Sequence, residues 1–174
     1  LRCLVGSEMC IRDRSKEPML EVDNVVEAGV LNNVSFKAYG GQILGFAGLV
    51  GAGRTEIMRA VFGADPIDSG KIKIKGKEVH IKSPRQAIKH GIAFLTEDRK
   101  GQGLVLAQTI RTNLILANMK GFSSGLFLNE KKILETGEQN IASLRIKTPS
   151  IDEIVGQLSG GNQQKVCLLY TSDA

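Results

Sequence analysis

Gly48-Leu-Val-Gly-Ala-Gly-Arg54-Thr55 is the stretch that decides the fold of this 174-residue chain. It matches the phosphate-binding pattern Gly-x-x-x-x-Gly-Lys-Ser/Thr, except that arginine stands at the position of the lysine. Glycines in such a loop let backbone N–H groups converge on an anion at the start of a helix. The stretch therefore predicts a site for the phosphates of a nucleotide.

The flanks of this loop predict a strand before it and a helix after it. The apolar run Gln42–Ala47 fits a buried strand, and Thr55–Phe62 fits a helix that ends before Gly63. One face of that helix carries the apolar residues Ile57, Ala60 and Val61. A dinucleotide-binding loop is excluded because its last glycine would fall on Glu56. A glycine-rich turn without a ligand is the alternative.

A second motif, Leu158-Ser-Gly-Gly-Asn-Gln-Gln-Lys165, places a serine and two glycines at the expected start of another helix. The first turn of a helix attracts anions, so this stretch is a second candidate phosphate site. By itself, the motif is equally compatible with a polar turn that caps a helix.

Together with Thr96-Glu-Asp-Arg-Lys-Gly-Gln-Gly103, the two motifs resemble the signature of an ATP-binding-cassette domain. More narrowly, Gly48–Glu56, Glu97–Lys100 and Leu158–Gln163 are similar to the second cassette of bacterial monosaccharide importers of the ribose/galactose/xylose type. The resemblance extends from about Glu17 to Val166. It implies an α/β P-loop NTPase fold of the ATP-binding-cassette type, with an antiparallel β subdomain, a helical signature subdomain and a missing C-terminal part.

Local patterns predict the remaining elements. Met19–Val26, Val34–Ala38 and Gly70–Ile81 are expected to form a mainly antiparallel sheet. Lysine alternates with isoleucine in Lys71–Lys77, which predicts lysines on the solvent face of a strand. Ile92–Leu95 is expected to be a buried strand.

Capping residues predict three further helices. Ser83-Pro84 opens a short helix that Gly91 closes, and Thr109 caps a helix through Asn118. Asn129 caps a longer helix through Leu144, with Ile133, Ile141 and Leu144 facing inward. The resemblance implies that residues from about 109 to 166 form the subdomain that presents the signature to a partner cassette.

In the family, two cassettes enclose two nucleotides, and the phosphate loop of one faces the signature of the other. The resemblance thus implies ATP and Mg²⁺ as cofactors. The implied nucleotide-binding residues are Gly48, Gly51, Ala52, Gly53, Arg54, Thr55, Glu97, Ser159, Gly160, Gly161 and Asn162. Thr55 and Glu97 are the implied metal ligands. No catalytic residue is expected, since the family's Asp-Glu strand and downstream histidine do not occur in the chain.

Three departures from the family pattern predict a weakened nucleotide site in this domain. Arg54 is planar and fork-shaped, whereas the usual lysine is a compact point charge. Glu97 stands where the family has glutamine, and its carboxylate repels phosphate. Glu27–Val30 offers no aromatic ring to stack on adenine. The signature, by contrast, is intact and is expected to serve the partner cassette.

The resemblance implies a subunit that couples ATP hydrolysis to monosaccharide uptake from the cytoplasmic face of the bacterial inner membrane. The implied partners are a first cassette of the same polypeptide or a second copy, integral-membrane permease subunits and, indirectly, a periplasmic sugar-binding protein. One alternative is a catalytically silent nucleotide-binding or regulatory module, which Arg54 and Glu97 favour. Another is a non-transport cassette ATPase. The transported sugar cannot be read from this sequence.

Composition agrees with one globular domain, at 42% hydrophobic and 24% charged residues. The net charge of +5 does not indicate a nucleic-acid partner, because aromatic residues are only 5% and do not interleave with the basic ones. No apolar run approaches the roughly 20 residues needed to span a bilayer.

The two ends of the chain are expected to be non-native. Glu8–Asp13 can be encoded GAG ATG TGT ATA AGA GAC, and an AG-starting codon can follow for Arg14. The reverse complement then contains TGT CTC TTA TAC ACA TCT, which encodes Cys167–Ser172. One adapter-like DNA element therefore accounts for both ends. We assign residues 1–14 and 167–174 to it and residues 15–166 to a partial nucleotide-binding domain.

Sequencing the source DNA through both junctions tests this assignment. We expect the adapter element at each junction, another cassette upstream of Ser15, and an apolar strand ending in Asp-Glu downstream of Val166. A coding sequence without that element, with a stop codon directly after Ala174, contradicts the assignment.

Overall fold

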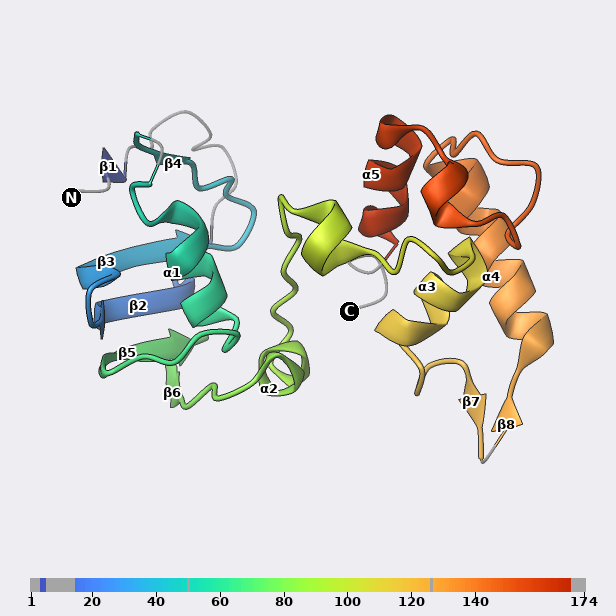
Figure 1. Cartoon of the computed structure of the whole chain (residues 1–174). Coiled ribbons are helices and arrows are strands. Elements are labelled where there is room, and N and C mark those ends of the chain that lie inside the picture. The colour runs from blue at the N-terminus through green and yellow to red at the C-terminus, as the bar shows by residue number, and fades with distance from the viewer. Residues whose placement is uncertain (1–3, 6–14, 50, 126, 170–174) are drawn as a thin grey trace. The chain divides into compact units, whose positions relative to one another are not determined.

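The chain folds into two compact units, which are described separately (Figure 1). The computed structural model describes residues 4–5, 15–49, 51–125 and 127–169. The first unit is Leu1–Phe94 and the second is Leu95–Ala174. Each unit has a hydrophobic core of its own.

An antiparallel sheet forms the base of the first unit, as the sequence predicts. Its strands, in spatial order, are β3 (Leu31–Tyr39), β2 (Pro18–Glu27), β5 (Ser69–Ile74) and β6 (Lys77–Val79). Val22 lies opposite both Phe36 and Ile72, and all three are buried. The lysines of β5 face outward, where Lys71 pairs with Glu78 at 3.2 Å and Lys73 with Asp23 at 3.0 Å.

Helix α1 (Arg54–Val61) packs its apolar face on this sheet (Figure 1). Ile57, Ala60 and Val61 are buried together with Val22, Val25 and Ile72, so the predicted face is confirmed. Helix α2 (Pro84–Lys89) follows Ser83 and ends at His90, also as predicted.

Two predicted strands are wrong or much shorter than expected. Of Gln42–Ala47, only Phe46–Ala47 forms a strand (β4), and it pairs antiparallel with Leu4–Val5 (β1). Ile92–Leu95 forms no strand. A strand needs a neighbour for its backbone groups, and the described residues provide no parallel partner for either run. Ile43 is accordingly 84% exposed and Leu95 48%.

The second unit is mainly helical. Its elements are η1, a π-helical turn over Arg99–Gly103, then α3 (Ile110–Ala117), β7 (Ser123–Ser124), β8 (Phe127–Leu128), α4 (Glu130–Ser143), the 3-10 turn η2 (Val155–Gln157) and α5 (Gly160–Leu168). The short β7–β8 hairpin was not predicted. Thr109 and Asn129 cap α3 and α4 by accepting hydrogen bonds from the N–H groups of Thr112 and Lys132, which confirms both predicted caps.

The core of the second unit lies between these helices. Its fully buried side chains include Ile110, Leu114, Ile133, Val155 and Val166. Helix α5 runs past Val166, and Cys167 and Leu169 are buried in the same core. The predicted non-native end therefore begins inside a helix, and its assignment stays a prediction.

No helix among the described residues has the length and apolar character to cross a membrane.

The packing of α1 predicts a contrast between two isoleucines. Ile57→Ala should lower the free energy of unfolding by about 2–5 kcal/mol, because it leaves a cavity in the core. Ile43→Ala should change that free energy by less than about 0.5 kcal/mol, because its side chain is exposed. Urea denaturation of the isolated chain measures both. Equal destabilisation by the two variants would show that Ile43 is buried in solution.

Candidate functional site

The phosphate loop has the geometry that its sequence predicts. Gly51 and Gly53 adopt φ values of 80° and 75°, a region that side chains rarely enter, and they turn the chain into α1. The first hydrogen bond within α1 runs from Ile57 N–H to the Gly53 carbonyl at 3.0 Å. The N–H groups of the first turn of α1 precede that bond and have no acceptor within the helix, whereas Ala52 N–H in the loop donates to the Leu49 carbonyl at 3.0 Å. A helix start of this kind is the arrangement that suits a phosphate.

Arg54 is the first residue of α1, and its side chain is exposed. A methyl group added to Gly48 would lie 4.0 Å from Cδ of Arg54, so the arginine stem passes near the start of the loop. The contact of the guanidinium with phosphates stays a prediction. Thr55 follows directly in the first turn of the helix.

A cavity of about 420 Å³ adjoins this loop. Gly51, Ala52 and Gly53 form one wall, and the segment from Val26 to Asn32 forms another. Phe46 also lines the cavity, but its ring packs edge-to-face against Phe36 at 4.9 Å. The Glu27–Val30 segment therefore lies next to the phosphate loop.

Glu27 is one of the residues that line this cavity. Its Oε2 atom is buried and has no hydrogen-bond partner among the described residues. A buried acceptor without a partner is costly, so this oxygen marks a local cost in the wall of the cavity. The sequence did not signal it, because Glu27 ends a strand and belongs to no motif.

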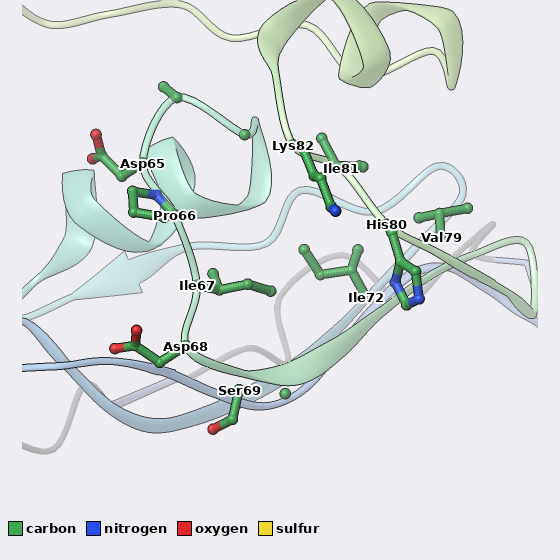
Figure 2. Close-up of a pocket in the computed structure, with 13 residues that line it drawn as sticks. Asp65, Pro66, Ile67, Asp68, Ser69, Ile72, Val79, His80, Ile81 and Lys82 are labelled. Atoms are coloured by element: carbon green, nitrogen blue, oxygen red, sulfur yellow. The ribbon is translucent and has the colours of Figure 1, made fainter.

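A larger cavity of about 530 Å³ lies at the opposite end of α1 (Figure 2). Its floor is apolar and includes Ile67, Ile72 and Ile81. The nearby carboxylates are already engaged: Asp65 accepts two hydrogen bonds from Arg59, and Asp68 accepts one from the N–H of Ala28. This cavity offers no cradle of N–H groups, so it is not the phosphate site.

The signature motif begins helix α5, as predicted. Ser159 is the capping residue, and the first hydrogen bond within the helix runs from Gln163 N–H to the Ser159 carbonyl at 2.9 Å. The N–H groups of Gly160, Gly161 and Asn162 precede that bond and have no acceptor inside the helix. A methyl group added to Gly161 would meet nothing within 4 Å, so this turn is open to an approaching ligand.

Asn162 fixes the shape of this turn. Its side chain exchanges two hydrogen bonds with the backbone of Lys147, at 3.1 and 3.2 Å, and donates a third to Oγ of Ser159 at 3.1 Å. The Ser159 hydroxyl accepts no hydrogen bond from a backbone N–H of its own helix. Its hydroxyl proton can consequently point towards a bound anion.

Comparison with known proteins identifies the family. A family model described as ABC transporter matches residues 31–172. The chain belongs to the ABC transporter family.

Curated relatives match this cassette closely over part of their length. It is 46% identical over 150 residues to a putative ribose/galactose/methyl galactoside import ATP-binding protein of Rhizobium etli, covering 86% of this chain and 29% of that protein. It is 45% identical to the ribose import ATP-binding protein RbsA of Bacillus licheniformis, covering 95% of this chain and 34% of that protein. The chain thus spans about a third of the length of the curated relatives it matches.

Solved structures share the fold. The ADP conformation of an ATP-binding cassette of an ABC transporter matches with a TM-score of 0.66 at 21% identity, covering 88% of this chain and 64% of that one. A nucleotide-free cassette matches with a TM-score of 0.65 at 20% identity, covering 88% and 65%. The predicted α/β cassette fold, with its antiparallel subdomain, is confirmed.

The described residues of the cassette fit a nucleotide better than they fit a metal alone. The phosphate loop offers N–H groups and the adjoining cavity offers apolar walls, as a nucleotide requires. The described part of the chain has no group of three His, Cys, Asp or Glu residues that could hold a metal by itself. Mg²⁺ would depend on Thr55 and the phosphate oxygens of the nucleotide.

Glu97 lies in the second unit, whereas Thr55 lies in the first. Their shared role as metal ligands therefore stays a prediction. Within the second unit, the loop Thr96–Gly103 packs against the signature helix through η1. The contact between this loop and the signature helix was not predicted from the sequence. The two segments lie more than 50 residues apart, and no local pattern indicates that they meet.

The ion pair at the end of α1 predicts a pH dependence of stability. Hydrogen bonds from Arg59 lower the pKa of Asp65, so the ionised carboxylate stabilises the folded state at neutral pH. That contribution is complete above the unfolded pKa, near 4, and is lost as the pH falls through the lower folded pKa. Asp65→Asn should therefore cost up to about 1 kcal/mol at pH 7, and less at lower pH.

Urea unfolding of the wild type and the variant from pH 7 to pH 2.5 measures this difference. Glu78→Gln, which removes the more exposed pair with Lys71, is the matched control and should have a smaller effect. A difference between wild type and Asp65→Asn that grows towards acid would contradict the assignment of the ion pair.

Proposed function

We propose that this chain is the ATP-binding part of a bacterial monosaccharide importer and corresponds to its second cassette. Family membership and the import ATP-binding relatives at 45–47% identity support this. The observation that carries the proposal is the open signature turn at Ser159–Asn162, whose N–H groups and hydroxyl suit a phosphate. Such a turn has a use only if another cassette presents a nucleotide to it.

Two nucleotide sites of unequal quality follow from this arrangement. The signature of this chain completes the site on the partner's phosphate loop, where Ser159 and the N–H groups of Gly160 and Gly161 bind the terminal phosphate. The site on its own loop holds ATP more weakly. At that site, Arg54 places a wide planar guanidinium where the family has the compact ammonium of lysine. The Glu27–Val30 segment also lacks an aromatic ring to stack on adenine.

The proposed function implies particular partners and a position at the membrane. The partner cassette belongs to the same polypeptide or to a second copy, and permease subunits receive the motion of the closed pair. A periplasmic sugar-binding protein acts indirectly by delivering the sugar. The chain is thus peripheral on the cytoplasmic face of the inner membrane, with ATP and Mg²⁺ as its cofactors.

A second candidate function is a catalytically silent module that binds nucleotide and regulates its partner. The side chain of Arg54 favours it, because this residue stands at the loop position that normally contacts the terminal phosphates. The two candidates differ in whether the signature turn supports turnover at the partner site.

Two variants of the full-length transport ATPase that contains this domain separate these candidates. Ser159→Arg should reduce steady-state ATP hydrolysis by about 10²-fold or more, because it fills the turn with a bulky cation and removes a phosphate donor. Arg54→Lys should change hydrolysis less than about threefold, since the partner's site does most of the turnover. Phosphate release from the purified, reconstituted importer measures both rates.

The opposite pair of effects would contradict the proposal that this chain supplies a signature but hydrolyses little ATP itself. If Arg54→Lys raises turnover manyfold while Ser159→Arg has little effect, this cassette hydrolyses its own nucleotide. If Ser159→Arg leaves hydrolysis unchanged but nucleotide still binds, the silent module is the better description.

A further inference from the structure

We propose that Arg99 is a positioning residue that ties the Thr96–Gly103 loop to the phosphate-binding turn of the signature helix. Its Nε donates a hydrogen bond to Oε1 of Gln163 at 3.3 Å. Its Nη2 lies 3.0 Å from the position that a methyl group on Gly160 would occupy. One side chain from the loop thus contacts both the first residue of α5 and its fourth. This inference rests on the proposed role of the signature turn.

Gln163 transmits the contact to the backbone around the signature. Its side chain is buried, with 6% of the residue exposed. Nε2 donates to the carbonyls of Val155 and Leu158, at 3.2 and 3.1 Å, while Oε1 accepts from Arg99. The side-chain amide of Gln163 therefore links helix α5 to the Val155–Leu158 segment that precedes it. Without Arg99, the described residues offer Oε1 no other hydrogen bond.

The loop that carries Arg99 is itself well ordered by short contacts. Oδ1 of Asp98 accepts from Gly101 N–H at 3.0 Å, and the Asp98 carbonyl accepts from Gly103 N–H at 3.2 Å. Oγ1 of Thr96 accepts from Asp98 N–H at 3.1 Å. Because Arg99 projects from this closed turn, a displacement of the turn moves the guanidinium and hence Gln163. Coupling through such contiguous contacts is the physical form that communication between sites takes.

The charge of Arg99 matters as well as its hydrogen bond. A guanidinium is always protonated, and no carboxylate among the described residues forms an ion pair with this one. It stands at the positive end of the α5 dipole, beside N–H groups that have no acceptor in the helix. The arginine thus raises the attraction of the signature turn for a phosphate. A side chain at position 160 would press on the guanidinium, which would have to shift by a few tenths of an ångström.

The test uses the full-length transport ATPase, reconstituted with its permease, and three variants. Arg99→Gln removes the charge and the fork. Arg99→Lys keeps the charge but loses the planar pair of donors. Lys100→Gln removes the same charge from the next residue of the loop, which is exposed, and is the matched control.

We expect Arg99→Gln to lower kcat for ATP hydrolysis by about tenfold or more, the scale of one lost charge-assisted hydrogen bond. The Kd for the first ATP should stay within about twofold, since the signature engages only when the cassettes close. Arg99→Lys should recover part of the lost kcat, and Lys100→Gln should match the wild type. A thermal melt of each variant corrects the rates for folded protein.

Two results overturn the inference. One is a kcat for Arg99→Gln within about twofold of the wild type once folded protein is counted. The other is an equal loss with Lys100→Gln, which would mean that any loop charge suffices. Ser159→Arg, measured alongside, keeps the two proposals apart: if it abolishes hydrolysis while Arg99→Gln does not, only the role of Arg99 fails. If Ser159→Arg is also silent, the proposed function fails.

Discussion

The constraint on which the structure depends is that the N–H groups in the first turn of a helix have no acceptor within that helix. Two helices begin with such a turn behind a conspicuous cap, α1 after Gly53 and α5 after Ser159. Residues from elsewhere in the same unit fix the position of each turn. Leu31 backs Gly53, where an added methyl group would lie 3.4 Å from its Cδ2, and Asn162 fixes the second turn on Lys147. Each unit thus contains one helix start whose backbone donors we propose as an anion site.

Much of the fold could be predicted because its signals are local. Thr109 and Asn129 are capping residues whose side chains satisfy N–H groups three residues ahead, so the boundaries of α3 and α4 follow from chemistry within one turn. The alternation of lysine and isoleucine in β5 likewise fixes which face is buried. The phosphate loop and signature turn were predictable for the same reason, since glycine and serine at fixed spacing set their geometry.

The failures arise where structure depends on distant partners. Gln42–Ala47 and Ile92–Leu95 have the composition of buried strands, yet a strand's backbone groups are satisfied only by a neighbouring strand. The described residues supply β4 with a two-residue partner and Ile92–Leu95 with none. The β propensity of these two runs was therefore not enough to form a strand without a partner. The contact of Arg99 with Gln163 joins residues 64 positions apart, and the burial of the Glu27 oxygen depends on the residues that pack around it.

The substitution at position 54 affects the two turns differently. Backbone N–H groups form the cradle around a phosphate, and their direction depends on Gly51 and Gly53, not on the side chain of Arg54. We therefore expect arginine to leave the capacity to bind phosphate in place and to alter only how the terminal phosphates are contacted. The signature turn has no equivalent weak point: Ser159, Gly160 and Gly161 are all present, and Asn162 holds their geometry. Under the proposed function, a domain with this pair of turns would retain what its partner needs from it even with a weaker site of its own.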